Sequence, residues 1–291
     1  MAETDMPSFG GPNAEQIKYW NEAAGETWAE REESLDQVIG PIGERALALS
    51  DAAPDERAVD VGCGCGATTA ELARRVGRKG AVLGVDVSRP MLGRARARAL
   101  ALGLANVSFL LADAQTAELG RDAFDLLFSR FGVMFFTDPT AAFANLRRAL
   151  RPGGRVAFVC WQAIQRNPWM LVPGLAIARH VPMPPPDPNR PGPFAFGDRE
   201  RIQSILSGAN FGEIAIQGEE LSLAPGGGDV NRAVEFALEI GPGAAALRAA
   251  GAGCELRARA ADTVREALEP FTQHGKLEMP AAVWLVRACR G

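Results

Sequence analysis

The stretch VDVGCGCGATT, residues 59–69, places Gly62, Gly64 and Gly66 at alternate positions directly after an apolar run. Glycine lacks a Cβ, so a backbone built from it turns sharply and comes close to a ligand. Residues 68–76 then read as a helix, and a helix start offers free N–H groups and a partial positive charge. A strand, a glycine turn and a helix start in this order predict a ligand site at the turn, suited to a phosphate or a carboxylate.

Short apolar runs alternate with helical stretches from residue 57 to residue 161. Continuous apolar strands separated by helices are typical of a parallel sheet that is covered on both faces. Such doubly wound α/β sheets bind ligands beyond the carboxyl ends of their strands. We expect helices at 68–76, 90–103 and 139–150, the last ending at RPGG (151–154), and strands at 57–62, 81–87, 106–113, 124–130 and 155–161.

The alternation ends after residue 161. The proline-rich segment HVPMPPPDPNRPGP, 180–193, is either a surface loop or a lid over the strand ends. A helix at 199–209, a strand at 213–223 and a last strand at 281–289 are expected beyond it. We therefore predict four regions: a helical cap at 1–50, a ligand-binding core at 51–161, a lid insertion at 162–212, and C-terminal strands at 213–291 that enclose a helical insertion at 229–270.

Composition narrows the function classes. The chain has 291 residues and a net charge of −4, which is typical of a globular protein and argues against nucleic acid as partner. We identify no signal peptide and no apolar run long enough to cross a membrane. The five cysteines lack zinc-site spacing, which favours reduced thiols in the cytoplasm, no metal site, and packing roles for Cys63 and Cys65. Arg94 and Arg98 share one helix face, which we interpret as solvated surface.

Two cofactor classes compete for the glycine turn. The spacing Gly62–x–Gly64–x–x–Ala67 satisfies the loose dinucleotide pattern, as in an NAD(P)-dependent oxidoreductase. S-adenosylmethionine would place its amino-acid end at the same turn. Asp60 favours the second class, because its carboxylate would repel a pyrophosphate but would pair with an ammonium group, directly or through water. Asp113, which ends the third expected strand, is well placed for an adenine amino group.

Five motifs in order resemble those of class I S-adenosylmethionine-dependent methyltransferases: VDVGCGCG (59–66), LGVDVS (83–88), LADA (111–114), FDLLFSRFG (124–132) and LRPGGRVAFVCW (150–161). The segment SRFGVMFF (129–136), followed by DP, is similar to a bacterial subgroup that acts on small molecules. The resemblance implies a doubly wound, seven-stranded, mostly parallel, Rossmann-like sheet with a helical N-terminal cap and lid insertions. It also implies methyl transfer to a small-molecule acceptor by in-line displacement.

The same resemblance implies a site for S-adenosylmethionine at Asp60, Gly62, Cys63, Gly64, Gly66, Thr68, Asp86, Val87, Met91, Asp113, Ala114 and Ser129. Gly62, Cys63 and Gly64 would line the methionine end, Gly66 would permit the turn, and Thr68 would donate its hydroxyl to the ligand carboxylate. Asp86 would accept hydrogen bonds from both ribose hydroxyls, and Met91 would pack on the adenine. Asp113 and the N–H of Ala114 would read the adenine edge, and the backbone of Ser129 would lie near the sulfonium.

The catalytic residues are not fixed by these motifs. Tyr19, Arg130, Trp161 and His180 are candidates for contacts with the substrate or for a general base, whereas His274 reads as a turn residue. The acceptor atom stays open among O, N, C and S, and so does the oligomeric state. SRFG (129–132) stands where many nucleic-acid amino methyltransferases carry Asn–Pro–Pro–aromatic. The alternatives are an NAD(P)-dependent oxidoreductase and a cofactor-binding protein without turnover.

Overall fold

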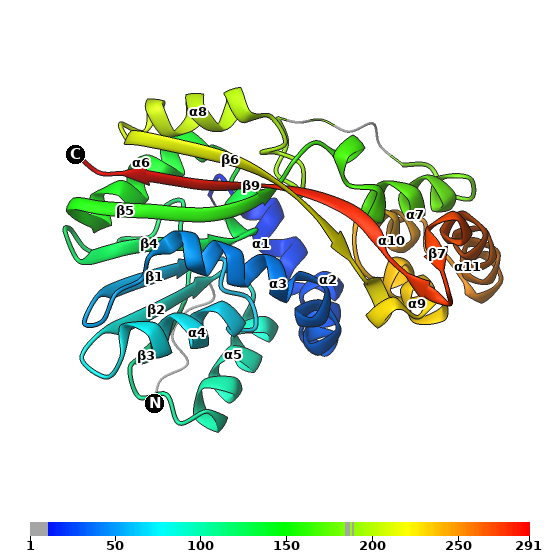
Figure 1. Ribbon diagram of the computed structural model, residues 1–291, viewed down its shortest axis with the longest axis horizontal. Helices are drawn as coiled ribbons and strands as arrows, with labels where there is room; N and C mark the ends of the chain where they lie inside the picture. Colours follow the sequence, from blue (N-terminus) through cyan, green and yellow to red (C-terminus); the bar gives the residue numbers. More distant parts are fainter. Residues whose placement is uncertain (1–10, 184–186, 188) are drawn as a thin grey trace.

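One seven-stranded sheet organises the computed structural model, which describes residues 11–183, 187 and 189–291 (Figure 1). Its strands are β1 Arg57–Val61, β2 Ala81–Asp86, β3 Val107–Leu111, β4 Phe124–Arg130, β5 Leu150–Trp161, β6 Gly212–Leu223 and β9 Met279–Cys289. They lie in the order β3-β2-β1-β4-β5-β9-β6. β1 to β5 are parallel, and β9 is antiparallel to both β5 and β6. The predicted doubly wound, mostly parallel sheet of seven strands is confirmed.

Helices cover both faces of this sheet. They are α1 Ala14–Asn21, α2 Ala23–Glu30, α3 Glu32–Ser50, α4 Ala67–Val76, α5 Arg89–Ala101, α6 Pro139–Ala149, α7 Pro168–Ala178, α8 Arg199–Gly208, α9 Val230–Glu239, α10 Pro242–Ala249 and α11 Cys254–Leu268. α3, α4 and α5 pack side by side on one face, and α6 packs with α8 on the other (Figure 1). The starts of α5 and α6 follow from sequence, since Ser88 and Asp138 cap them and proline stands in each first turn.

The structure differs from the expected elements at three places. β5 begins at Leu150 and not at residue 155, because Gly153 and Gly154 exchange backbone hydrogen bonds with Arg290. α7 was not predicted, and Pro173, which lies inside it, breaks the usual helix pattern. The hairpin of β7 Thr272–Gln273 and β8 Lys276–Leu277 was also missed, although His274 does lie in its turn. Residues 184–186 and 188 of the proline-rich segment, and residues 1–10 of the cap, lie outside the described residues.

The two predicted insertions meet at one end of the sheet. β6 and β9 extend beyond the other strands towards a group of helices made of α7, α9, α10 and α11 (Figure 1). α7 and α9 contact one another, and each of them also contacts α10 and α11. α7 comes from 162–212 and the other three from 229–270, so segments far apart in the sequence form one layer beside the carboxyl end of β5.

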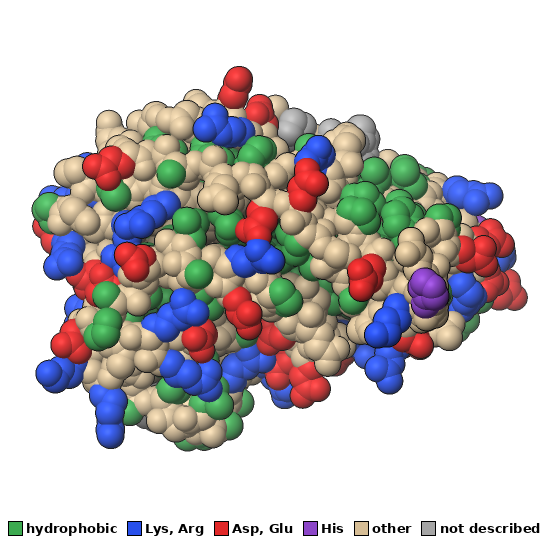
Figure 2. Space-filling model, in the orientation of Figure 1, with side chains coloured by type: hydrophobic (Ala, Val, Ile, Leu, Met, Phe, Trp, Pro, Cys, Tyr) green, Lys and Arg blue, Asp and Glu red, His purple; other side chains and the backbone are tan. Residues whose placement is uncertain are grey.

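The surface carries both signs of charge. On the face shown in Figure 2, Lys and Arg side chains alternate with Asp and Glu over the whole sheet region. No helix within the described ranges is both long and apolar enough to cross a bilayer.

Candidate active site

The glycine turn is held tightly against its neighbours. Gly62, Gly64 and Gly66 have φ of +67°, +55° and +77°, values that L side chains rarely adopt. A Cβ on Gly62 would lie 2.6 Å from the Cα of Gly132. The N–H groups of Gly62 and Cys63 both donate to the carbonyl oxygen of Val85. The alternating glycines therefore let the β1–α4 turn approach the end of β4 and fasten it to the end of β2.

A cleft of about 730 Å³ opens beside this turn, at the carboxyl ends of β1 to β4. Of the predicted site residues, the cleft brings together Gly62, Asp86, Val87, Met91, Asp113, Ala114 and Arg130. Its lining also includes residues that were not among the predicted site residues: Asn13, Gln16, Trp20, Trp28, Phe135 and Phe136.

Asp86 ends β2 with its carboxylate in this cleft, only 8% exposed. One oxygen accepts the N–H of Gly64 and the other accepts the N–H of Ser88, both at 2.8 Å. Burial raises the pKa of this carboxyl, and the backbone donors oppose that rise. An ionised carboxylate has about four acceptor positions, so two N–H groups leave room for a pair of ligand hydroxyls.

Asp113 follows the neighbouring strand β3, one residue after Ala112, whose N–H donates to the carbonyl of Asp86, and it is tied to the segment before α1. Its Oδ1 accepts the amide of Asn13 and the N–H of Gln115, both at 2.9 Å. The Oδ1 of Asn13 accepts the N–H of Thr137 at 2.8 Å. Asn13 thus joins the segment before α1 to two loops at the sheet edge. The sequence gives only a weak indication of this role of Asn13, because an asparagine before a helix is ordinarily interpreted as a helix cap.

Asp60 is fully buried beneath the turn. Its Oδ2 accepts the hydroxyls of Thr68 at 2.9 Å and Thr69 at 2.6 Å, while its Oδ1 has no partner within the described part of the chain. Burial raises the pKa of Asp60 to about 6, against the lowering effect of the two hydroxyls and of Arg130. The orphaned oxygen fits the predicted attraction for a cationic group. The hydroxyl of Thr68 differs from expectation, because it donates to Asp60 rather than towards a ligand.

Two further predicted cofactor positions, Ser129 and Cys63, lie behind the lining, as does Cys65. Ser129 is fully buried, where its hydroxyl donates to the carbonyl of Val61 at 2.7 Å and accepts the N–H of Gly132. Ser129 itself does not line the cleft, whereas Gly132 does. Cys63 is buried and its pKa is raised by burial, and burial raises the pKa of Cys65 to about 12. Both thiols are inert packing groups at neutral pH.

The catalytic candidates separate by position. Tyr19 is 37% exposed and lies outside the cleft lining, and its neighbour Trp20 takes the inward place. His180 lines neither cavity described here, and its Nε2 lies 2.7 Å from the hydroxyl of Thr263. Arg130 lines the cleft and forms an ion pair with Asp36 at 3.2 Å. The structure therefore keeps only Arg130 of these four beside the cleft.

Trp161, the remaining candidate, borders a second cavity of about 850 Å³, which we call the chamber. The chamber lies between the end of β5 and the helices α7, α9 and α10. Trp28, Phe131 and Phe135 line both cavities. These three aromatic side chains form the boundary between the cleft and the chamber.

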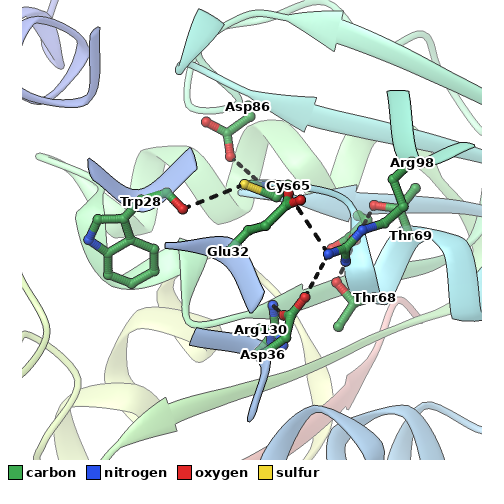
Figure 3. Close-up of polar contacts among 11 residues, drawn as sticks. Trp28, Glu32, Asp36, Cys65, Thr68, Thr69, Asp86, Arg98 and Arg130 are labelled. Carbon is green, nitrogen blue, oxygen red and sulfur yellow. Dashed lines mark hydrogen bonds and ion pairs between the residues drawn. The ribbon is translucent and has the colours of Figure 1, made fainter. Parts of the chain in front are cut away.

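Charged side chains fasten α3 to α5 and to the end of β4 (Figure 3). Asp36 of α3 pairs with Arg98 of α5 at 2.8 Å and with Arg130 at the end of β4. Glu32, one turn earlier, pairs with Arg94. The arginines of α5 do share a face, as expected, but that face meets acids of α3 and is not a freely solvated surface. Among the described residues, no group of three His, Cys, Asp or Glu side chains could hold a metal ion.

Comparison with known proteins agrees with this geometry. Residues 58–154 match the family model of a methyltransferase domain. The strand order, the glycine turn and the acidic strand ends are those of the Rossmann-like class. Residues 58–154 therefore resemble a methyltransferase domain, and they lie within a sheet of the Rossmann-like strand order.

Two curated relatives share the central part of the chain. Aklanonic acid methyltransferase DauC of Streptomyces sp. (strain C5) is 37% identical over 122 residues, 42% of this chain and 56% of that protein. Nocamycin O-methyltransferase of Saccharothrix syringae is 37% identical over 120 residues, 41% of this chain and 43% of that protein. The chain thus spans about half the length of the curated relatives it matches.

Solved structures support the fold over most of the chain. A putative methyltransferase from Bacillus halodurans C-125 aligns with a TM-score of 0.57 and 15% identity, covering 85% of this chain and 98% of that one. Geranyl diphosphate C-methyltransferase from Streptomyces coelicolor A3(2) aligns with a TM-score of 0.55 and 16% identity, covering 98% of this chain and 100% of that one. At such identities the likeness establishes the fold alone.

Proposed function

We propose that this chain transfers a methyl group from S-adenosylmethionine to a small molecule. The observation that carries the proposal is the set of acids around the positive-φ glycine turn: Asp86 and Asp113 in the cleft, with Asp60 buried below. Acids favour a ligand that is cationic and rich in hydroxyl and amino donors. The curated relatives, whose names specify single small molecules, support a small-molecule acceptor.

Each acid has a separate task in binding. Asp86 accepts the ribose hydroxyls on its remaining lone pairs, and Asp113 with the N–H of Ala114 reads the adenine edge. Asp60 attracts the ammonium group through water, because its Oδ1 lies below the turn and has no protein donor among the described atoms. Met91, which borders the cleft at 7% exposure, packs on the adenine ring.

The bound sulfonium supplies an electrophilic methyl carbon. The chain contributes position and exclusion of water, since the leaving thioether needs no acid. Holding two reactants in line removes about 7–11 kcal/mol of barrier in well-oriented systems. Trp28, Phe131 and Phe135 stand where the two cavities meet, and they would form the dry passage through which the methyl group is handed over.

The alternative of a nicotinamide dinucleotide is less well supported. Its pyrophosphate would face the first turn of α4, where the hydroxyls of Thr68 and Thr69 already serve the buried carboxylate of Asp60. Burial already makes the ionised form of Asp60 costly, as its pKa of about 6 shows. A second negative group beside it would raise that cost further.

Calorimetry with S-adenosylmethionine, S-adenosylhomocysteine and NAD in parallel tests the proposal. We expect both sulfur compounds to bind and NAD not to bind. Asp86→Ala should weaken S-adenosylhomocysteine at least tenfold, about 1.4 kcal/mol. Asp198→Ala is the matched control, because Asp198 caps α8 outside both cavities. Micromolar NAD binding without either sulfur compound would favour the oxidoreductase, and an unchanged affinity in Asp86→Ala would show that the ribose lies elsewhere.

Turnover is tested separately, by transfer of labelled methyl from S-adenosylmethionine to a metabolite extract. Labelled small molecules are the expected product, and cofactor binding without any transfer would favour a non-catalytic binding protein.

We further propose a cytoplasmic location without nucleic-acid or membrane partners. Five free cysteines and a net charge of −4 support this location.

A further inference from the structure

Asn13 stands directly before α1 but does not cap it. Within the described ranges, its side chain makes no hydrogen bond to the first turn of α1, whereas Ser88 and Asp138 accept such bonds at the starts of α5 and α6. Asn13 thus lacks the stabilising contact for which asparagine is usually found at this position. It is nevertheless only 4% exposed. Because buried amides are hydrogen-bonded, the partners of Asn13 indicate its role.

The two ends of the Asn13 amide have opposite partners. Its Nδ2 donates to Oδ1 of Asp113 at 2.9 Å, and its Oδ1 accepts the N–H of Thr137 at 2.8 Å. An ionised carboxylate cannot donate a hydrogen bond and a backbone N–H cannot accept one. These partners therefore fix which end of the amide faces Asp113, since the reversed orientation would lose both bonds.

The two described donors to the Asp113 carboxylate reach the same oxygen. Besides Asn13, the N–H of Gln115 donates to Oδ1 at 2.9 Å. The other oxygen, Oδ2, accepts no hydrogen bond within the described part of the chain. Asn13 and Asp113 both line the cleft. One carboxylate oxygen of Asp113 is therefore held by the protein, and the other is left for a ligand.

A carboxylate held in this way distinguishes two purine bases. Adenine carries an amino group at position 6, which donates hydrogen bonds, whereas hypoxanthine carries an oxo group there, which only accepts them. A carboxylate oxygen beside that oxo group would meet a second acceptor, and it would avoid this only by turning away. The two donors on Oδ1 oppose such a turn. Sites built to hydrogen-bond a ligand N–H strongly reject analogues that lack it.

We infer that Asn13 is a positioning residue that holds the carboxylate of Asp113 and thereby makes the cleft prefer an adenine base over a hypoxanthine base. The inference rests on the proposed function, in which Asp113 reads the adenine edge. Asn13 acts through Asp113 and does not itself contact the base. Since Asn13 lies outside the residues that match the family model, 58–154, part of base recognition in this chain comes from its N-terminal segment.

Calorimetry with S-adenosylhomocysteine and S-inosylhomocysteine, which differ only in the base, tests the inference without turnover. The measured quantity is the ratio of the two dissociation constants. We expect the parent chain to prefer the adenine compound by about tenfold or more. Asn13→Ala should lower this preference by about three- to tenfold, the effect of one hydrogen bond.

Asn21→Ala is the matched control. Asn21 also fastens α1, because its amide donates to the carbonyl of Val87 and its Oδ1 accepts the N–H of Arg89. It holds the backbone after β2 and no side chain that reads the base. Asn21→Ala should therefore weaken both compounds equally and leave their ratio unchanged.

Two changes at Asp113 show whether Asn13 acts through it. In an Asp113→Ala background, Asn13→Ala should leave the preference unaltered, because the residue that it positions is gone. In Asp113→Asn, the amide oxygen must replace Oδ1 to accept from Asn13 and Gln115, which puts the NH₂ group in the place of Oδ2. That NH₂ group repels the amino group of adenine and donates to the oxo group of hypoxanthine. Asp113→Asn should therefore favour the adenine compound less than Asp113→Ala does, and this test does not require that Asn13→Ala folds.

The outcomes separate the inference from the proposed function. If Asn13→Ala weakens both compounds equally, as Asn21→Ala does, Asn13 only holds the cap and the inference is wrong. If Asn13→Ala also lowers the preference in the Asp113→Ala background, Asn13 contacts the base directly and does not act by positioning. If Asp113→Asn keeps the preference of the parent chain, the held oxygen is not oriented as inferred. A parent chain that binds both compounds equally would overturn the inference alone, whereas one that binds neither would overturn the proposed function as well.

Discussion

Replacement of Asp86 by asparagine gives a test of the site that begins in the free protein. Asp86 accepts two backbone N–H groups, from Gly64 and Ser88, one on each carboxylate oxygen. Asparagine has one acceptor oxygen and one NH₂ group of the same shape. In Asp86→Asn, one of the two N–H donors must therefore face another donor in a position that is only 8% exposed.

An unsatisfied buried donor costs about 1–3 kcal/mol. In domains of 150–250 residues, 1 kcal/mol shifts the melting temperature by about 2–4 °C, so we expect a fall of about 2–12 °C. The same change removes the charge that would strengthen hydrogen bonds from the ribose. Loss of charge-assisted hydrogen bonds of about 1.5–3 kcal/mol weakens S-adenosylhomocysteine by about 10- to 150-fold. Thermal unfolding by circular dichroism and calorimetry measure the two effects.

Asp198→Asn is the control, since asparagine caps a helix about as well as aspartate and Asp198 lies at the start of α8. It should keep the melting temperature and the affinity of the parent chain. The reasoning is refuted if Asp86→Asn melts and binds as the parent chain does. A fall in affinity with an unchanged melting temperature would refute the backbone contacts of Asp86 but not its contact with the cofactor.

Three further changes probe the same region. The pKa of Asp60, raised from 3.8 to about 6, means that the folded chain binds a proton there that the unfolded chain has lost. The stability of the parent chain relative to Asp60→Asn should therefore fall by about 2 kcal/mol as pH rises from 4 to 7, and a pH-independent difference in urea unfolding would contradict this. Gly62→Ala should cost about 2–5 kcal/mol, from positive φ and a Cβ only 2.6 Å from Gly132. Gly227→Ala, with φ of +68°, ψ of 22° and no atom within 4 Å, should cost only about 1–2 kcal/mol in the same assay; equal costs would show that Gly62 is not crowded. Asp36→Ala should lower the unfolding free energy by about 1 kcal/mol in low salt and by less in 1 M salt, which screens partly exposed ion pairs; a salt-independent loss would indicate packing instead.

Local pattern predicted the elements of the sheet well. Strands with continuous apolar residues and helices with caps are fixed by contacts within a few residues, so β1 to β4, α4 and α5 lie within two residues of their expected ends. The predicted element bounds were wrong where pairing between residues distant in the sequence determines where a strand begins. β5 begins at Leu150 because Gly153 and Gly154 pair with Arg290, near the end of the chain.

The candidate site divides in the same way. The sequence by itself determined the glycine turn and the acids at the strand ends, because a parallel sheet brings all its carboxyl ends to one edge. Only the tertiary structure decided that Asn13 reaches Asp113, 100 residues away, and that Thr68 serves Asp60. The chamber was likewise invisible in sequence, because α7 and α9 look like ordinary apolar helices until their packing leaves a space. A cavity forms where elements that are distant in the sequence pack without filling the space between them. The hydrophobic periodicity within a single helix or strand carries no information about such packing.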